Sequence, residues 1–239
     1  MNKKASHVGI ILSFAIFITF LAFLYSITEP AFQTQKNQKI LLSYLQKELI
    51  DQSSLNINSS SVKIIVEETN NCIRLKDLLD DIGMGLKVIV KNTSEFISES
   101  YKVNNDLVIN RVSAQEDFFK IYSSEEFKEL DNNIINPCAN LKRNDNDYSI
   151  GLTKKEVYIF DTELINLINK YENDYLAFKN ELKIPEGNDF AFSFKLSNGT
   201  IISTSEKDVT TSIYAEEVPI QYMDKNAKIN YGFLTVKIW

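Results

Sequence analysis

The stretch Val8–Ile27, VGIILSFAIFITFLAFLYSI, decides how this chain of 239 residues is organised. It contains neither a charge nor a proline, and Lys3 and Lys4 stand shortly before it. As an α-helix rising about 1.5 Å per residue, it would match the roughly 30 Å hydrocarbon core of a bilayer. We therefore predict a transmembrane helix. The alternatives are a buried core helix and a cleaved secretory signal, but signal cores are shorter and no Ala-x-Ala-like site follows before Pro30.

The charges on either side of the span predict its orientation. Lysine and arginine near a span favour the cytoplasmic side, and Lys3 and Lys4 are the only charges before it. On the other side, Lys36 and Lys39 lie farther from the apolar run. We therefore expect a cytoplasmic N-terminus and an extracellular segment 28–239.

Small residues recur within the span at intervals of four, three and four, at Ala15, Thr19, Ala22 and Ser26. On a helix this spacing forms one narrow stripe. Small stripes let helix backbones approach closely inside a membrane, so the pattern predicts packing against another helix. The alternative is that Ala, Ser and Thr are simply common in spanning helices.

The order Lys3-Lys4, then small Ala5, then an uninterrupted apolar helix resembles the class III signal region of archaeal type IV pilin-like proteins. The resemblance is confined to the first 27 residues. It implies a peptidase cut after Ala5, which would leave Ser6 as the mature N-terminus. It also implies that the apolar helix packs with copies of itself, or with other pilin-like subunits, in a filament core.

After the span, we predict a break or kink at Thr28–Pro30, because proline lacks the amide proton of a continuing helix. A second helix is expected from Ala31 to Asp51, with Leu41, Leu42, Leu45 and Leu49 on one face. The Ser- and Asn-rich run Ser53–Ser61 has no periodicity and is typical of a linker. The predicted units are a basic region and span (1–27), a stalk helix (28–52), a linker (53–61) and an extracellular head (62–239).

The first half of the head contains short runs rich in β-branched and aromatic residues, separated by polar breaks. They predict strands at Val62–Glu67, Leu86–Lys91, Glu99–Val103, Leu107–Arg111 and Phe118–Tyr122. Short helical turns are expected at Lys76–Asp81 and Glu125–Leu130. Gly83 and Gly85 follow an acidic loop and lack a third glycine, so they indicate a turn rather than a nucleotide-binding loop.

The second half begins with a predicted helix over Asp161–Lys183, with Asp161 as its N-cap and apolar residues at intervals of four and three. This helix should pack across the sheet of the head. Turn signals then separate strands at Phe190–Leu196, Thr200–Ser203, Ser212–Met223 and Lys228–Trp239, which predict an antiparallel meander. Because proline cannot donate a hydrogen bond within a sheet, Pro219 predicts that its strand is an edge strand or a bulged one. The predicted fold class is therefore α+β, with a membrane helix and stalk ahead of a mainly antiparallel sheet.

Composition excludes several functions. His7, at the membrane edge, is the only histidine, so the head cannot hold a histidine base or a histidine metal site. Beyond the span the chain has 24 basic and 32 acidic residues, a net charge of −8 that disfavours nucleic acid. The run from Asp145 to Glu156 matches a calcium loop only in part, because its glycine is Gly151 rather than residue 150. We therefore expect no enzyme activity, no cofactor and no metal.

Two further sets of residues are consistent with an extracellular head. Cys72 and Cys138 are the only cysteines, and an oxidising exterior would favour a disulfide, with two free buried thiols as the alternative. Asn58, Asn92 and Asn198 begin Asn-x-Ser/Thr sequons, which we expect on the surface and available for glycans.

Two functions remain open. In the first, the protein is a pilin-like structural subunit anchored in the membrane and displaying its head outside. In the second, it is an uncleaved single-span surface protein whose head binds a ligand or a partner protein.

Overall fold

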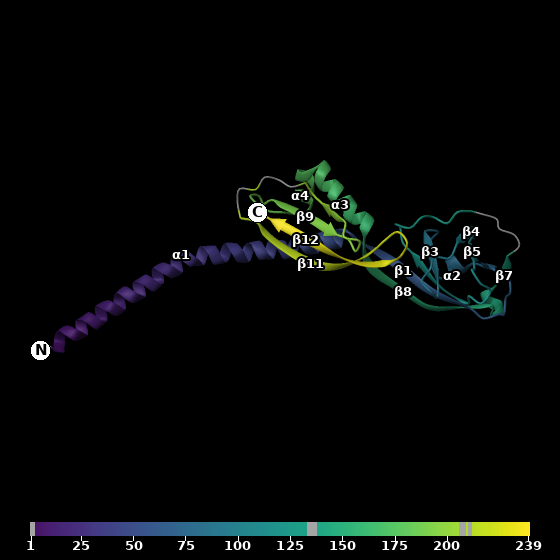
Figure 1. Ribbon diagram of the computed structural model, residues 1–239, viewed down its shortest axis with the longest axis horizontal. Helices are drawn as coiled ribbons and strands as arrows, with labels where there is room; N and C mark the ends of the chain where they lie inside the picture. Colours follow the sequence, from purple (N-terminus) through teal and green to yellow (C-terminus); the bar gives the residue numbers. More distant parts are fainter. Residues whose placement is uncertain (1–2, 133–137, 206–208, 210–211) are drawn as a thin grey trace.

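The computed structural model describes residues 3–132, 138–205, 209 and 212–239; at 3–8 and 30–34 only the backbone is described. One long helix, α1 (Lys3–Gln52), runs from the N-terminal end into a body made of two lobes (Figure 1). The proximal lobe holds α3, α4 and the C-terminal strands, and the distal lobe holds β2 to β7. The predicted α+β class, with an apolar N-terminal helix and a mainly antiparallel sheet, is confirmed.

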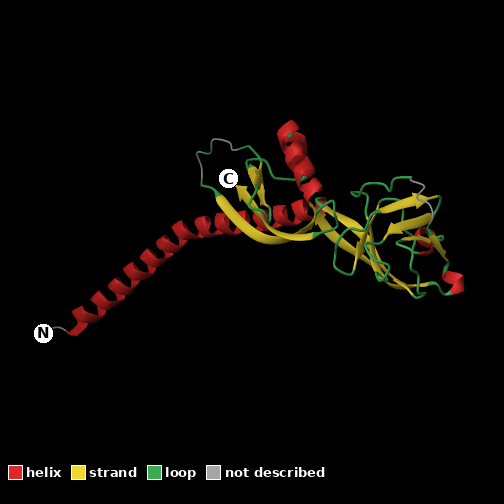
Figure 2. Cartoon of the chain, turned by 45° about the vertical axis from the view of Figure 1, so that its right-hand side comes forward, coloured by secondary structure: helices red, strands yellow, loops and turns green. Residues whose placement is uncertain are grey.

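The helix α1 is continuous over 50 residues, so the predicted break at Thr28–Pro30 is wrong. The fixed φ of proline is itself compatible with a helix, and the missing amide proton removes only one hydrogen bond of a long ladder. Instead of breaking, the helix bends between its free end and its packed end (Figures 1 and 2).

The predicted stalk does not stand apart from the head. Leu42, Leu45 and Leu49 are buried, and they belong to the same hydrophobic cluster as Phe178 and Phe190. The spacing of three and four residues puts these leucines on one face, as the sequence predicts. This face packs on the head's own core, however, so the inner turns of α1 are part of the globular body.

The predicted linker Ser53–Ser61 is also corrected, because residues 54–64 form β1, which pairs with β8 on one side and β6 on the other. Pairing on both sides satisfies the backbone, and the buried Ser60 hydroxyl lies 3.1 Å from that of Thr153. The main sheet has the order β10-β9-β12-β11-β8-β1-β6-β3. Its strands are β1 (Ser54–Ile64), β3 (Val88–Asn92), β6 (Phe118–Ser123), β8 (Tyr148–Phe160), β9 (Phe190–Lys195), β10 (Ile201–Ser203), β11 (Tyr214–Met223) and β12 (Ile229–Ile238).

A second sheet, of order β4-β5-β2-β7, covers one face of the distal lobe. Its strands are β2 (Cys72–Leu75), β4 (Ser100–Val103), β5 (Asp106–Asn110) and β7 (Ala139–Leu141), with the short helices α2 (Leu78–Asp81) and η1 (Arg143–Asp145) beside them. The strands expected near β3, β4, β5 and β6 are present, whereas β2, β7 and β8 were not predicted. Residues 125–130 contain a turn at 125–126 rather than the expected helix, and the N–H of Phe127 bonds to the carbonyl oxygen of Ser124.

The predicted helix over 161–183 is two helices, α3 (Asp161–Asn173) and α4 (Tyr175–Glu181). Asp174 separates them and caps α4, accepting a hydrogen bond of 3.0 Å from the N–H of Ala177. Asp161 is the first residue of α3, and its expected N-cap position is held by Phe160.

The C-terminal strands do not follow a simple meander, because β12 inserts between β9 and β11 and leaves β10 at the edge. Pro219 lies where β11 pairs with β12 alone, since β8 joins β11 only at Tyr222 and Met223. Pro219 therefore lies on a stretch of β11 with one free side, although the strand as a whole lies between β12 and β8 and is not the predicted edge strand. Leu234, Val236 and Ile238 are fully buried, as their alternation predicts.

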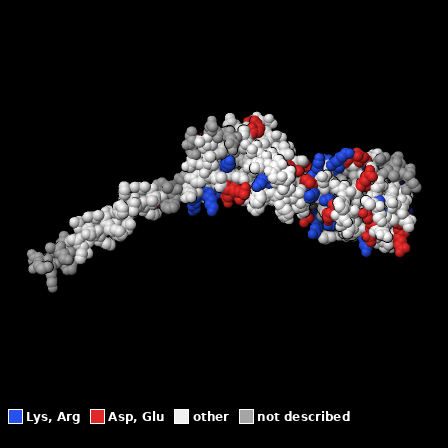
Figure 3. All heavy atoms as spheres, in the orientation of Figure 1, with Lys and Arg blue, Asp and Glu red and all other residues white. Residues whose placement is uncertain are grey.

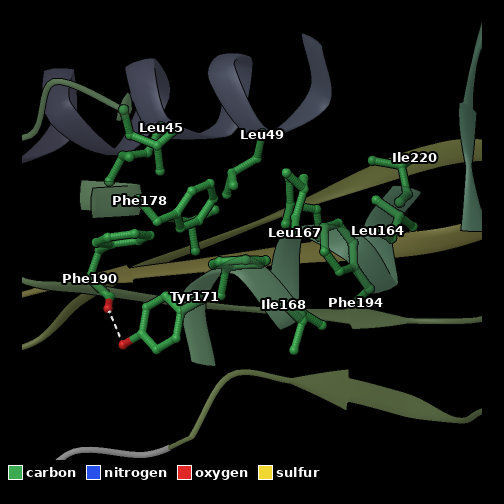
Figure 4. Packing of buried hydrophobic residues seen from close by; sticks show 14 of the residues in the cluster. Leu45, Leu49, Leu164, Leu167, Ile168, Tyr171, Phe178, Phe190, Phe194 and Ile220 are labelled. Atoms are coloured by element: carbon green, nitrogen blue, oxygen red, sulfur yellow. Dashed lines mark hydrogen bonds between the residues drawn. The ribbon is translucent and has the colours of Figure 1, made fainter. Parts of the chain in front are cut away.

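The proximal core joins α1, α3, α4 and the sheet. Phe190, Phe192 and Phe194 alternate along β9 and point to the core, where Tyr171 and Phe178 pack against them. The hydroxyl of Tyr171 donates to the carbonyl oxygen of Phe190 at 2.8 Å (Figure 4). Leu45 and Leu49 meet this cluster from α1, on the side shown at the top of Figure 4.

Truncating Leu45 should test whether the inner turns of α1 belong to the core. Leu45→Ala should lower the free energy of unfolding by about 2–5 kcal/mol, because it leaves a cavity in a packed core. Ile40→Ala is the matched control, since Ile40 is on the same part of the helix and is 59% exposed. Chemical denaturation of the detergent-solubilised chain, followed by near-ultraviolet circular dichroism, measures both. Equal stabilities would show that α1 is not part of the cooperative unit.

Candidate functional site

The outer half of α1, Gly9–Glu29, is an apolar surface that no other part of the described chain covers. The segment Gly9–Glu29 has a mean hydropathy of 2.5 and none of it is buried, and no other helix among the described residues is long and apolar enough to cross a membrane. Phe14 is 64% exposed and Phe17 is 56% exposed. The described part of this half carries no basic side chain (Figure 3). An apolar surface of this size requires a lipid or protein environment.

The backbone and polar side chains of this segment are suited to such an environment. Every turn is helical, so the backbone hydrogen bonds are made within α1, except the one that Pro30 cannot donate to the carbonyl oxygen of Ser26. The hydroxyl of Thr19 donates to the carbonyl oxygen of Ile16 at 2.9 Å, and that of Thr28 to the carbonyl oxygen of Leu24 at 3.0 Å. The segment therefore exposes few unsatisfied hydrogen-bonding groups.

The predicted stripe of Ala15, Thr19, Ala22 and Ser26 is exposed along its whole length. No other part of the described chain packs against it, so its role in helix packing stays a prediction. Ala5 and Ser6 lie near the start of α1, where only the backbone is described. Cleavage between them also stays a prediction.

The structure joins Cys72 and Cys138 in a disulfide, as predicted, with a Cα–Cα distance of 4.6 Å. Cys72 begins β2, and Cys138 directly precedes β7. These two strands pair in parallel from Ile73 and Ala139 onward. The bond therefore fastens the two chain segments at the start of this pairing.

The three sequons differ in exposure. Asn198 lies exposed in the turn before Gly199, whose φ of +84° suits glycine, and its Oδ1 accepts from the N–H of Thr200. Asn58 lies half-buried within β1, where it pairs with β6 and β8. Asn92 is only 6% exposed, so the expected surface position is wrong for this residue.

The burial of Asn92 has a structural cause. Its Oδ1 accepts from the N–H groups of Ser94 and Phe96, and its Nδ2 donates to the carboxylate of Glu116. These bonds fold the loop after β3 back on itself. The asparagine thus acts as a turn residue rather than as a glycan acceptor.

The acidic run Asp145–Glu156 does not form a metal loop. Asp147 accepts from the N–H of Lys142 at 2.8 Å, and Asn146 adopts a left-handed φ of 59°, so the run closes a turn at η1. No group of three or more His, Cys, Asp or Glu side chains in the described ranges could hold a metal ion.

Sequence reasoning missed a trough of about 870 Å³ where the two lobes meet. Its floor is the face of β6, β1 and β8 opposite to the distal core, and its walls are the loop 95–97 and the hairpin turn 226–229. The side chains on its floor include Phe118, Lys120, Tyr122, Ser59, Ser61, Leu152, Lys154, Glu156 and Tyr158. These residues alternate along three strands far apart in the chain. Only the alternation of Phe118, Lys120 and Tyr122 could have signalled a second exposed face.

Lys91 fastens the two walls of the trough together. Its Nζ donates to the carbonyl oxygen of Ala227 at 2.6 Å, lies 4.0 Å from a carboxylate oxygen of Glu95 and stands 5.6 Å from the centre of the Tyr122 ring. Burial lowers the pKa of the Lys91 ammonium. The hydrogen bond with Glu95 instead raises the pKa of Lys120.

Comparison with protein-family models, with curated proteins and with solved structures finds no match to this chain. The site must therefore be interpreted from its own residues.

Removing the disulfide should destabilise the distal lobe. The bond links residues 66 apart, and loop closure of this length is worth about 4 kcal/mol in the chain-entropy model. The variant Cys72→Ser/Cys138→Ser should unfold at a correspondingly lower denaturant concentration. The reductant control is decisive: reduction should shift the wild type to the midpoint of the variant and leave the variant unchanged.

Glycan occupancy should follow exposure. In a host that modifies Asn-x-Ser/Thr sequons, peptide mass spectrometry should find glycan on the peptide containing Asn198 and none on that containing Asn92. Asn198→Gln removes the signal and is the control. Modified Asn92 in folded protein would contradict the turn described here.

Proposed function

We propose that this protein is a membrane-anchored extracellular structural protein, a pilin-like subunit whose N-terminal helices pack with one another. The observation that supports this proposal is the division of α1. Its outer half, Gly9–Glu29, is apolar and wholly exposed, whereas Leu42, Leu45 and Leu49 are buried in the head.

This division matters because a flexible membrane anchor would not need inner turns that are packed in the core of the head. When the inner turns of a continuous helix lie in the core, the outer turns project from the head in a defined direction. Helices that pack together through their outer halves would then arrange their heads regularly. The small stripe Ala15–Ser26 offers a face for this packing, with Phe14 and Phe17 left for lipid or for neighbouring subunits.

The alternative is an uncleaved single-span surface protein whose head binds a ligand. The trough between the lobes favours this reading, because a purely structural head has no need of an open cavity. The two functions differ in whether the N-terminus is cleaved and in whether the N-terminal helices of several chains pack together.

Processing and assembly can be tested together in the native cell. If the protein is a filament subunit, mass spectrometry should find a mature chain that begins at Ser6, and shearing should release the protein without detergent. Peptides that begin only at Met1 or Asn2, from protein that stays in the membrane, would favour the fixed anchor.

The stripe can be tested with a matched pair of variants. Ala15→Leu/Ala22→Leu should abolish filaments by separating the helices, while the protein still enters the membrane, because leucine is favourable there. Phe14→Leu/Phe17→Leu makes the same number of changes on another face and should assemble. Electron microscopy of sheared material compares them, and loss of filaments in both variants would show that the stripe has no special role.

A further inference from the structure

The trough between the lobes exposes hydrogen-bond donors without partners. Among the described residues, the ammonium groups of Lys154 and Lys228 form no ion pair. The hydroxyls of Tyr122 and Tyr158 likewise form no hydrogen bond within the part of the chain that the structure describes. These four groups come from β8, β6 and the turn before β12 and line one cavity. Ser59 and Ser61 add two more hydroxyls to its floor.

Carboxylates are scarcer than lysines in the same place. Of the two carboxylates that line the trough, Glu95 is engaged by Lys120 and lies near Lys91, which leaves Glu156. The lining has four lysines against two glutamates, although the whole chain has a net charge of −6. A complementary ligand is therefore rich in acceptor oxygens and negatively charged.

The remaining lining is apolar and partly aromatic. The rings of Tyr122 and Tyr158 and the side chain of Leu152 provide flat apolar surface between the polar groups. The backbones of β1 and β6 are paired on both sides within the sheet, so this part of the floor has no free edge for an added peptide strand. A ligand on the faces of β1 and β6 is therefore recognised by side chains, whereas β8 pairs with β11 only at Ile159 and Phe160 and, among the described residues, keeps a free edge beside the trough.

We propose that the trough binds an acidic oligosaccharide, with its carboxylates at Lys154 and Lys228 and the apolar faces of its sugar rings on Tyr122 and Tyr158. Sugars combine these two requirements, because each ring has C–H faces that pack on aromatic side chains and oxygens around its rim that accept hydrogen bonds. The cavity of about 870 Å³ lies within the range of about 300–1,000 Å³ that is typical of ligand sites. Its position between two lobes is also common for such sites.

The hairpin turn of the proximal lobe supplies Lys228, and Lys91 ties this turn to β3 through the carbonyl of Ala227. The backbone of the turn that carries Lys228 is therefore held against the sheet before a ligand arrives. Such preorganisation lowers the entropy cost of binding. Figure 3 shows basic side chains on the distal lobe close to its junction with the proximal lobe.

The test uses the full chain in a polyoxyethylene detergent, which has no sugar head group. Isothermal titration with tetragalacturonate should give saturable binding with a Kd below about 1 mM, and maltotetraose should give none. Lys154→Gln/Lys228→Gln should weaken binding about 100-fold, because each charged contact contributes about tenfold. Added salt should weaken binding of the wild type as well.

The matched control is Lys155→Gln/Lys225→Gln. It removes the same charge from residues that neighbour the site but do not line the trough, and neighbours on a strand point to opposite faces. Its affinity should stay within about twofold of the wild type, and equal melting curves show that both variants fold.

Three outcomes would overturn the proposal. One is the absence of binding to tetragalacturonate, and another is equal weakening in the two double variants, which would mean nonspecific attraction. The third is equal binding of tetraglutamate, which would assign the trough to acidic peptides. None of these outcomes depends on filament formation, so failure here is separate from failure of the proposed function.

Discussion

The packing of the inner turns of α1 on the aromatic cluster of the proximal lobe is the contact on which the rest of the structure depends. Leu42, Leu45 and Leu49 fill a face that Phe178 and Phe190 also contact. Burial of three such side chains contributes about 1.5–3 kcal/mol each, against a typical net stability of about 5–15 kcal/mol for a domain. The same helix therefore completes the hydrophobic core of the proximal lobe with its inner turns and exposes an apolar surface along its outer half. Its two halves satisfy different environments within one continuous helix.

The two lobes are held together mainly by a pair of long strands. In the register of β1 and β8, Ser54 pairs with Ile159 beside α3, and Ile64 pairs with Tyr148 in the distal lobe. Separate hydrophobic clusters lie at the two ends, and a smaller one that contains Ile57, Phe160 and Met223 lies between them. Because β11 stays with β8 for only two residues, the sheet opens at this point and leaves the trough.

Sequence patterns predicted the features that depend on local periodicity. The apolar span, the leucine face at 42–49 and the buried alternation at the C-terminus follow from spacings of 3.6 and 2 residues. The disulfide was predicted from residue count and compartment, and the Cα–Cα distance of 4.6 Å agrees. For the span, the leucine face and the C-terminal alternation, a short window of sequence holds the whole signal.

The features that were missed depend on partners distant in the chain. The segment Ser53–Ser61 has a linker's composition, and it becomes a strand because β6 and β8 supply hydrogen bonds on both sides. Pro30 lies in a helix because the turns before and after it hold the helix together. Asn92 is buried because Glu116 and two backbone amides replace water around its side chain. Burial of this kind cannot be predicted from the sequon alone.

The trough was not predicted for the same reason, since Lys154, Lys228, Tyr122 and Tyr158 stand in separate strands and a turn, and no local pattern groups them. What sets them apart is that three strands and one turn bring unpartnered donors together beside apolar rings. The strands β1 and β8, which line the trough, extend beyond the proximal lobe from the free end of α1 (Figure 1). A helix packed in a membrane or a filament core would therefore leave the opening of the trough clear of that packing. Assembly through α1 and recognition of a ligand by the head are thus compatible in a single chain.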